Sequence, residues 1–86
     1  MLIVKDFWAE WCGPCRMMKP VVEKLAEENT NVKFEFINVD EDSESSAKYG
    51  VRSIPTFIFE KDGEIVEKKV GGISRQEFQD IINKHK

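Results

Sequence analysis

The sequence lacks several features on which particular classes of protein depend. It has only two cysteines, Cys12 and Cys15, and one histidine, His85, in 86 residues. A secreted disulfide scaffold uses several distant cysteine pairs, and a structural zinc site needs four ligands, so both classes are disfavoured. No apolar run approaches the roughly 18 residues of a membrane span. The net charge is −3, with both signs interspersed, so no basic surface for nucleic acid is expected.

The beginning of the chain shows no targeting signal. It enters an apolar segment at once, without a basic region, an apolar signal core or a cleavage site, which predicts the absence of a signal peptide and a cytoplasmic location. The length and the 41% hydrophobic content, without repeats or a linker, predict one domain over residues 1–86. There is no phosphate-binding glycine loop or dinucleotide fingerprint, so we expect no bound cofactor.

What the sequence does contain is an alternation of strand and helix patterns. Strands are expected at 2–7, 32–39, 55–60 and 64–70, and helices at 14–28, 43–49 and from 74 onwards. Pro20 is expected to kink the first helix. Asp62-Gly63 predicts a hairpin between the last two strands. Because a strand–helix–strand unit is right-handed and parallel, the order βαβ, short helix, ββα predicts an α/β fold. Its four-stranded mixed sheet should have the spatial order 2-1-3-4, flanked by helices.

The two cysteines form a C-x-x-C motif between the first strand and the first helix. In Trp11-Cys12-Gly13-Pro14-Cys15, Cys12 faces the free N–H groups and the positive end of the helix dipole, and both stabilise a thiolate. Cys15 lies one turn later, close enough to bridge and expected to be more buried. Cys12 can then attack a substrate disulfide and Cys15 can resolve the mixed disulfide. A purely structural bridge is disfavoured, because so short a loop constrains the unfolded chain little.

Several other residues have ordinary structural interpretations. Asp6 is either a solvated strand-end residue or a buried one, and the apolar run around it favours burial. Pro55 has the trans isomer as its default at a strand start. The remaining expectations are core packing for Trp8 and Phe57, helix-face packing for Met17 and Met18, a surface position for Trp11, and a solvated helix start for residues 40–44.

Taken together, these residues resemble the thioredoxin family. The cysteine motif matches the family's active-site motif in full, as do residues 6–10 before it; Pro20 and segments 38–40, 54–56 and 70–71 also fall where the family has equivalents. The resemblance implies a thioredoxin-like fold and a protein-disulfide reductase with a redox-active disulfide. Such a protein serves electron transport and cell redox homeostasis. It implies disulfide-containing protein substrates and a separate donor of the thioredoxin-reductase type.

The resemblance also implies roles for individual residues. Asp6 would be a buried base that takes the proton from Cys15, and burial would raise its pKa. Pro55 would be a cis-proline facing the cysteines, beside which the backbone of Ile54 pairs with an extended substrate segment. The surface that docks substrate would consist of Trp11, Gly13, Pro14, Ile54, Pro55 and Gly71.

The sequence departs from the family in two places. A typical member has a strand and a helix before the segment equivalent to residues 2–7, so strand 32–39 should be a sheet edge with one sheet face less covered. Charged side chains on that face, at Lys5, Lys33 and Glu35, suit exposure to solvent and a self-sufficient monomer. The same face is where a weak dimer would form. The second departure is Phe36, which stands where the family often has a lysine and deprives Asp6 of a cation.

A binding module is the alternative function. In that interpretation the fold serves as a docking partner and the cysteines are dispensable. The combination of the cysteine motif with Asp6 and Pro55 favours the enzyme.

Overall fold

The computed structural model describes residues 1–86 and contains seven elements. In chain order these are β1 (Leu2–Trp8), α1 (Gly13–Glu28), β2 (Lys33–Asn38), α2 (Ser43–Lys48), β3 (Thr56–Lys61), β4 (Glu64–Val70) and α3 (Arg75–His85). The strands form one sheet in the order β2-β1-β3-β4, in which β1 and β2 are parallel and the other pairs antiparallel. The predicted topology is confirmed, and each element end that was predicted lies within one residue of the observed one.

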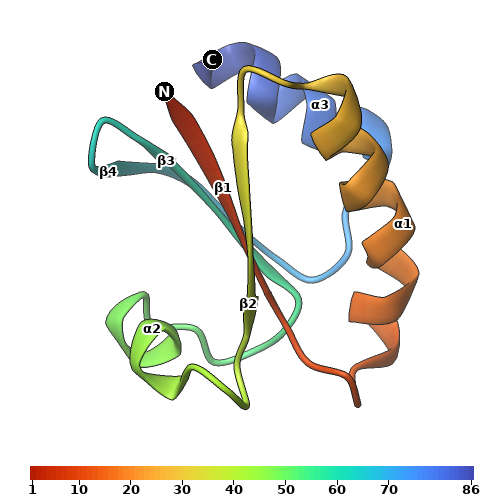
Figure 1. Cartoon of the computed structure of the whole chain (residues 1–86), viewed down its shortest axis with the longest axis vertical. Helices are drawn as coiled ribbons and strands as arrows, with labels where there is room; N and C mark the ends of the chain where they lie inside the picture. The colour runs from red at the N-terminus through yellow and green to blue at the C-terminus, as the bar shows by residue number, and fades with distance from the viewer.

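The main core lies between one face of the sheet and two helices. In Figure 1, α1 and α3 lie together on one side of the strands, whereas α2 lies on the other side, at the lower left. The apolar stripe of α1 is buried as its spacing predicts and meets the aromatic side chains of β3 and α3. Phe78 of α3 packs edge-on against Phe57 and Phe59, with ring centroids 5.1 and 5.3 Å apart.

Local sequence features fix the ends of these elements. The Ser74 hydroxyl accepts a hydrogen bond from the N–H of Glu77 and caps α3, and Asp42 caps α2 through the N–H of Ser45. Asp62 and Gly63 both have positive φ, at 52° and 84°, as a two-residue hairpin turn requires. The hairpin predicted from this dipeptide is therefore confirmed.

The second face of the sheet is covered by α2 and by an ion-pair network. Lys5 of β1 is paired in register with Glu35 of β2, and its ammonium group lies 2.9 Å from the Glu35 carboxylate. Lys33 joins the same carboxylate at 3.3 Å. Tyr49, directly after α2, packs its ring against Phe7 with centroids 5.8 Å apart. The predicted charges do lie on this face, with β2 as an edge strand.

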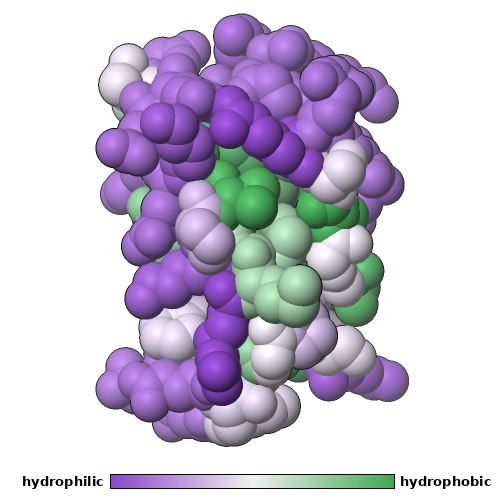
Figure 2. Space-filling view, turned by 90° about the vertical axis from the view of Figure 1, so that its right-hand side faces the viewer, coloured by the Kyte–Doolittle hydropathy of each residue, from purple (hydrophilic) through white to green (hydrophobic).

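The face formed by α1 and α3 carries apolar residues in its middle, surrounded by hydrophilic ones (Figure 2). Met18 is buried, but Met17 is 78% exposed, so the expectation of helix-face packing for both methionines is wrong for Met17. One position along a helix turns a side chain by about 100°, which carries Met17 away from the core. None of the helices combines the length and the apolar character needed to cross a membrane.

Candidate active site

The two cysteines meet where β1 runs into α1. Cys12 is the N-cap of α1, with extended backbone angles, and its Sγ accepts a hydrogen bond of 3.2 Å from the N–H of Cys15. Cys12 and Cys15 form a disulfide with a Cα–Cα distance of 5.3 Å, within the usual range for such bonds. The sulfur atom of Cys12 is therefore placed where backbone N–H groups and the helix dipole stabilise negative charge, as the sequence predicts.

The expectation that Cys15 is more buried than Cys12 is wrong. The two residues are 5% and 4% exposed. The loop before β3 covers Cys12, and the Cys12 Sγ lies 3.8 Å from the carbonyl oxygen of Ile54. Both cysteines form a small buried cluster with Ala9, and the partly buried side chains of Trp8, Val39 and Ile54 pack against it. Covering by a segment about forty residues away in sequence cannot be inferred from the motif alone.

Two loops face the disulfide as one unit. The Ile54–Pro55 peptide bond is cis, in agreement with the family resemblance and against the trans default. The N–H of Gly71 donates a hydrogen bond of 2.8 Å to the carbonyl oxygen of Pro55. Gly71 has φ of +90°, a conformation that only glycine adopts readily. This bond joins the end of β4 to the Ile54–Pro55 segment and places Gly71 beside it.

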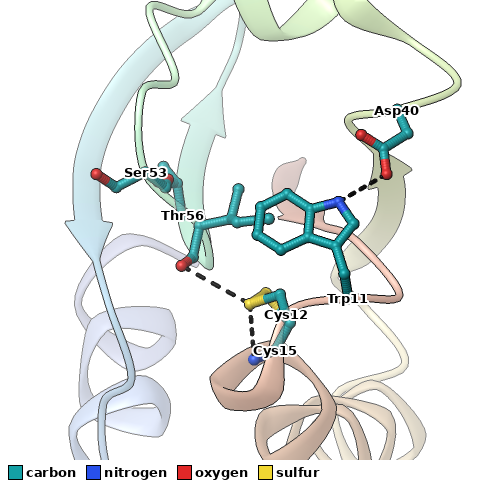
Figure 3. The surroundings of a disulfide bond; sticks show 7 residues. Trp11, Cys12, Cys15, Asp40, Ser53 and Thr56 are labelled. Carbon is teal, nitrogen blue, oxygen red and sulfur yellow. Dashed lines mark hydrogen bonds between the residues drawn. A yellow bond between two sulfur atoms is a disulfide. The ribbon is translucent and has the colours of Figure 1, made fainter.

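Trp11 is exposed, as predicted, and is held by a residue that sequence reasoning missed. Its side chain is 69% exposed, and its indole N–H donates a hydrogen bond of 2.8 Å to the carboxylate of Asp40 (Figure 3). Asp40 belongs to the acidic segment interpreted as a solvated helix start, of which only Asp42 acts as a cap. The contact could have been predicted from the topology, because parallel β1 and β2 end at the same edge of the sheet and the residues that follow them lie close together there.

Removal of the Asp40 carboxylate is expected to weaken substrate docking without unfolding the protein. In Asp40→Ala the exposed indole loses its fixed partner, and the catalytic efficiency toward a protein disulfide should fall about fivefold, equivalent to about 1 kcal/mol. Insulin-reduction kinetics would measure the effect. Glu41→Ala is the matched control, because Glu41 makes only a backbone bond here. Equal kinetics for the two variants would contradict a positioning role for Asp40.

Asp6 is buried, as the apolar run predicts. It is 6% exposed, and loss of solvent raises its pKa to about 7. Phe36 lies opposite it in the β1–β2 register and supplies no charge. A carboxyl group with such a pKa changes its protonation state near neutral pH, as a proton acceptor in a reaction requires.

A partly open cavity of about 350 Å³ reaches both Asp6 and Cys15. Its lining residues come from β1, the following loop, α1 and β2: Asp6, Trp8, Glu10, Cys15, Arg16, Lys19, Glu23 and Phe36. Trp8, expected to be a core residue and not part of the site, packs against the cysteine cluster and lines this cavity. Its indole N–H is buried without a protein partner.

Comparison with known proteins agrees with this geometry. The sequence profile of the thioredoxin family, described as "Thioredoxin", matches residues 1–84. The chain belongs to the thioredoxin family. It is 48% identical to a thioredoxin of Bacillus subtilis over 85 residues, which cover 98% of this chain and 82% of that protein. It is 43% identical to a thioredoxin of Porphyra purpurea, covering 96% of this chain and 78% of the relative.

Solved structures of thioredoxins share the fold. The structure of Fasciola hepatica thioredoxin superposes with a TM-score of 0.93 at 46% identity, covering 99% of this chain and 81% of that one. Thioredoxin NaTrxh of Nicotiana alata gives a TM-score of 0.94 at 45% identity, covering 99% and 73%. Family membership and the bonded cysteine pair identify the chain as a thiol–disulfide oxidoreductase of the disulfide-reductase class.

Proposed function

We propose that this thioredoxin-family chain, acting as one unit over residues 1–86, reduces disulfide bonds in proteins through Cys12 and Cys15. The observation that carries the proposal is the position of Cys12 at the helix N-terminus, where its Sγ accepts a hydrogen bond from the N–H of Cys15. In the reduced protein the same N–H and the helix dipole favour the Cys12 thiolate, which is the attacking species in exchange.

The reaction has two exchange steps that balance in electrons. In the first, the Cys12 thiolate forms a bond to one substrate sulfur, the substrate disulfide breaks, and the other substrate sulfur leaves as a thiolate. In the second, Cys15 loses its proton and attacks Cys12, so the mixed disulfide breaks and the remaining substrate sulfur leaves as a thiolate. The substrate gains two electrons, and the protein gains the Cys12–Cys15 bond seen here.

Asp6 is the proposed acceptor of the Cys15 proton. Asp6 and Cys15 line the same cavity, and the pKa of Asp6, raised to about 7, lies closer to that of a thiol than an ordinary carboxyl pKa does. A smaller difference in pKa makes proton transfer from a thiol less costly. The proton can then leave through the open side of the cavity.

The proposed docking surface surrounds Cys12 and consists of Trp11, Gly13, Pro14, Ile54, Pro55 and Gly71. Trp11 is fixed by Asp40, and Gly71 is fixed to the Pro55 carbonyl, so both sides of the surface are ordered before substrate arrives. The Ile54 backbone next to Cys12 offers hydrogen-bonding groups to an extended segment carrying the target disulfide.

Turnover requires a separate reductant, for which we propose a thioredoxin-reductase-type donor. The dithiol carries the electrons itself, so the chain needs no bound cofactor in this scheme. We place the activity in the cytoplasm, because a reductant of this kind works where thiols are kept reduced. We propose a monomer as the active form, since the second sheet face carries the Lys5–Glu35–Lys33 network.

A trapping experiment tests the assignment of the two cysteines. Cys15→Ser should accumulate a mixed disulfide with a protein substrate, because Cys12 can attack but serine cannot resolve. Mass spectrometry of the adduct should place the bond at Cys12, and dithiothreitol should release it. Cys12→Ser is the matched variant and should give little adduct. A bond that forms at Cys15 with equal yield would contradict the assignment of roles.

A further inference from the structure

An apolar line on α1 continues from the proposed docking surface towards the middle of the helix. Pro14, Met17 and Val21 follow one another at spacings of three and four residues, which places them on one side of α1. Pro14 already belongs to the docking surface. Together with Gly13, Arg16 and Met17 it lines a shallow depression at the start of the helix. The depression therefore joins Met17 to the docking surface.

The exposure of these side chains distinguishes them from the core residues of α1. Met17 is 78% exposed and Val21 is partly buried against the main core, whereas Met18 is buried. Ile73, directly before α3, is also partly buried against that core. Its loop lies against α1, because the Met18 Sδ is 3.9 Å from the place that a Cβ atom at Gly72 would occupy. The apolar strip defined in this way consists of Pro14, Met17, Val21 and Ile73.

Charged residues end the strip on the side away from the disulfide. Lys24 is exposed one turn after Val21, and Glu28 at the end of α1 forms an ion pair with Arg75 of α3. Figure 2 shows the same change, from apolar surface in the middle of this side to hydrophilic surface above it. Because α1 rises about 1.5 Å per residue, Val21 lies about 10 Å beyond Pro14. The strip is therefore a short extension of the docking surface along α1.

The size of the strip suits a short segment of a substrate protein. Two of its four side chains are partly buried, so it offers much less than the roughly 800 Å² that each partner of a stable protein pair buries. An extended segment advances about 3.3 Å per residue, so about three residues span the distance from Pro14 to Val21. A segment whose disulfide lies at Cys12 can therefore place a nearby side chain on the strip.

We propose that the apolar strip takes part in substrate recognition and favours target cysteines that have a bulky apolar side chain about three residues away. This inference rests on the proposed reduction of protein disulfides and names a class of substrate segment for it. Met17 makes the main contact, since Val21 and Ile73 are partly buried in the domain itself. An unbranched methionine side chain adapts to apolar side chains of different shape.

The test compares two symmetrical disulfides, each formed from two copies of a peptide with one cysteine. The first peptide has leucine at the third residue on both sides of the cysteine, and the second has serine there. Oxidation of the reduced protein by each disulfide is followed by tryptophan fluorescence. The wild-type protein should react about fivefold faster with the leucine peptide, as expected when about 40 Å² of apolar surface is buried in the transition state.

Met17→Gln should remove this preference by slowing the reaction with the leucine peptide alone, and Met17→Leu should retain it. Because Met17 is exposed, neither variant should alter the fold. Ile65→Gln is the matched control: Ile65 is 52% exposed but lies at the end of β4 away from Gly71. Equal rates of the wild-type protein with both peptides, or a preference that survives in Met17→Gln, would overturn the proposal. So would an equal loss of preference in Ile65→Gln.

Two further outcomes have separate meanings. A dimer of the wild-type protein that Met17→Gln dissociates in analytical ultracentrifugation would assign the strip to a second copy of the chain and contradict substrate recognition. Failure of the disulfide-reductase function itself is distinguishable, because Cys12→Ser would then react with both peptides as fast as the wild-type protein does. Failure of the strip alone leaves the reaction dependent on Cys12 but indifferent to the leucine residues.

Discussion

Replacement of Cys12 by serine is expected to abolish the reduction of insulin disulfides in the presence of dithiothreitol, leaving the rate of dithiothreitol alone. The serine hydroxyl is not ionised near neutral pH, and its oxygen atom cannot form the mixed disulfide with the substrate. The N-cap hydrogen bond itself survives, because serine accepts the Cys15 N–H as well as a thiolate does. Loss of activity would therefore reflect chemistry and not unfolding.

Two measurements make this result decisive. Circular dichroism should show the same helix content for Cys12→Ser and the reduced wild-type protein. Asp40→Ala, which keeps both cysteines, should retain a measurable rate under the same conditions. If Cys12→Ser reduced insulin at the wild-type rate, the disulfide-reductase function would be wrong, and the binding module would become the better interpretation.

Asp6 is expected to make the oxidised protein less stable at pH 8 than at pH 4 by about 4 kcal/mol, relative to an Asp6→Asn variant. Its pKa is raised from 3.8 to about 7 in the folded state by burial. Each pKa unit corresponds to about 1.4 kcal/mol of free energy. Below pH 4 the group is protonated in both states and has no effect. Between pH 4 and 7 the unfolded chain ionises while the folded state resists, so stability falls; above pH 7 the penalty is constant.

Urea unfolding of the two oxidised proteins across pH 4 to 8 measures this difference. The comparison with Asp6→Asn cancels the other carboxyl groups, such as Glu35 and Asp42, whose pKa values are lowered and whose effect has the opposite sign. Asn has nearly the same volume and no charge, so the gap between the two curves should open as pH rises. A gap independent of pH would show that Asp6 titrates normally in the folded protein.

Much of the site could be predicted because its determinants are local. The position of Cys12 at the start of α1 follows from the strand before it and the apolar stripe after it. The burial of Asp6 follows from its place within a continuous apolar run. The sheet order follows from the handedness of the βαβ unit and the Asp62-Gly63 turn. The cis bond at Pro55 came only from the family resemblance, because the intrinsic preference of a peptide bond is trans.

The features that could not be predicted depend on contacts between distant segments. Cys12 is as buried as Cys15 because the Ile54 loop lies over it, and the motif contains no information about that loop. Trp8 is aromatic and adjacent to a strand, which indicates burial but not the place of burial. It lines the Asp6 cavity together with residues of α1 and β2, and the sequence alone does not place those elements against it. Met17 is apolar, which indicates packing, but its position on the helix turns its side chain away from the core.

The disulfide has two sides that share few residues. The sulfur atom of Cys12 lies by the Ile54 carbonyl, on the proposed docking surface, whereas Cys15 borders the cavity of Asp6. In the proposed mechanism, substrate recognition and proton transfer therefore occupy separate surfaces of one small domain. If both assignments hold, substitutions in α1 and β2 around the cavity change the rate of resolution and leave the docking surface intact, whereas substitutions on the docking surface change the partners and leave the cavity intact.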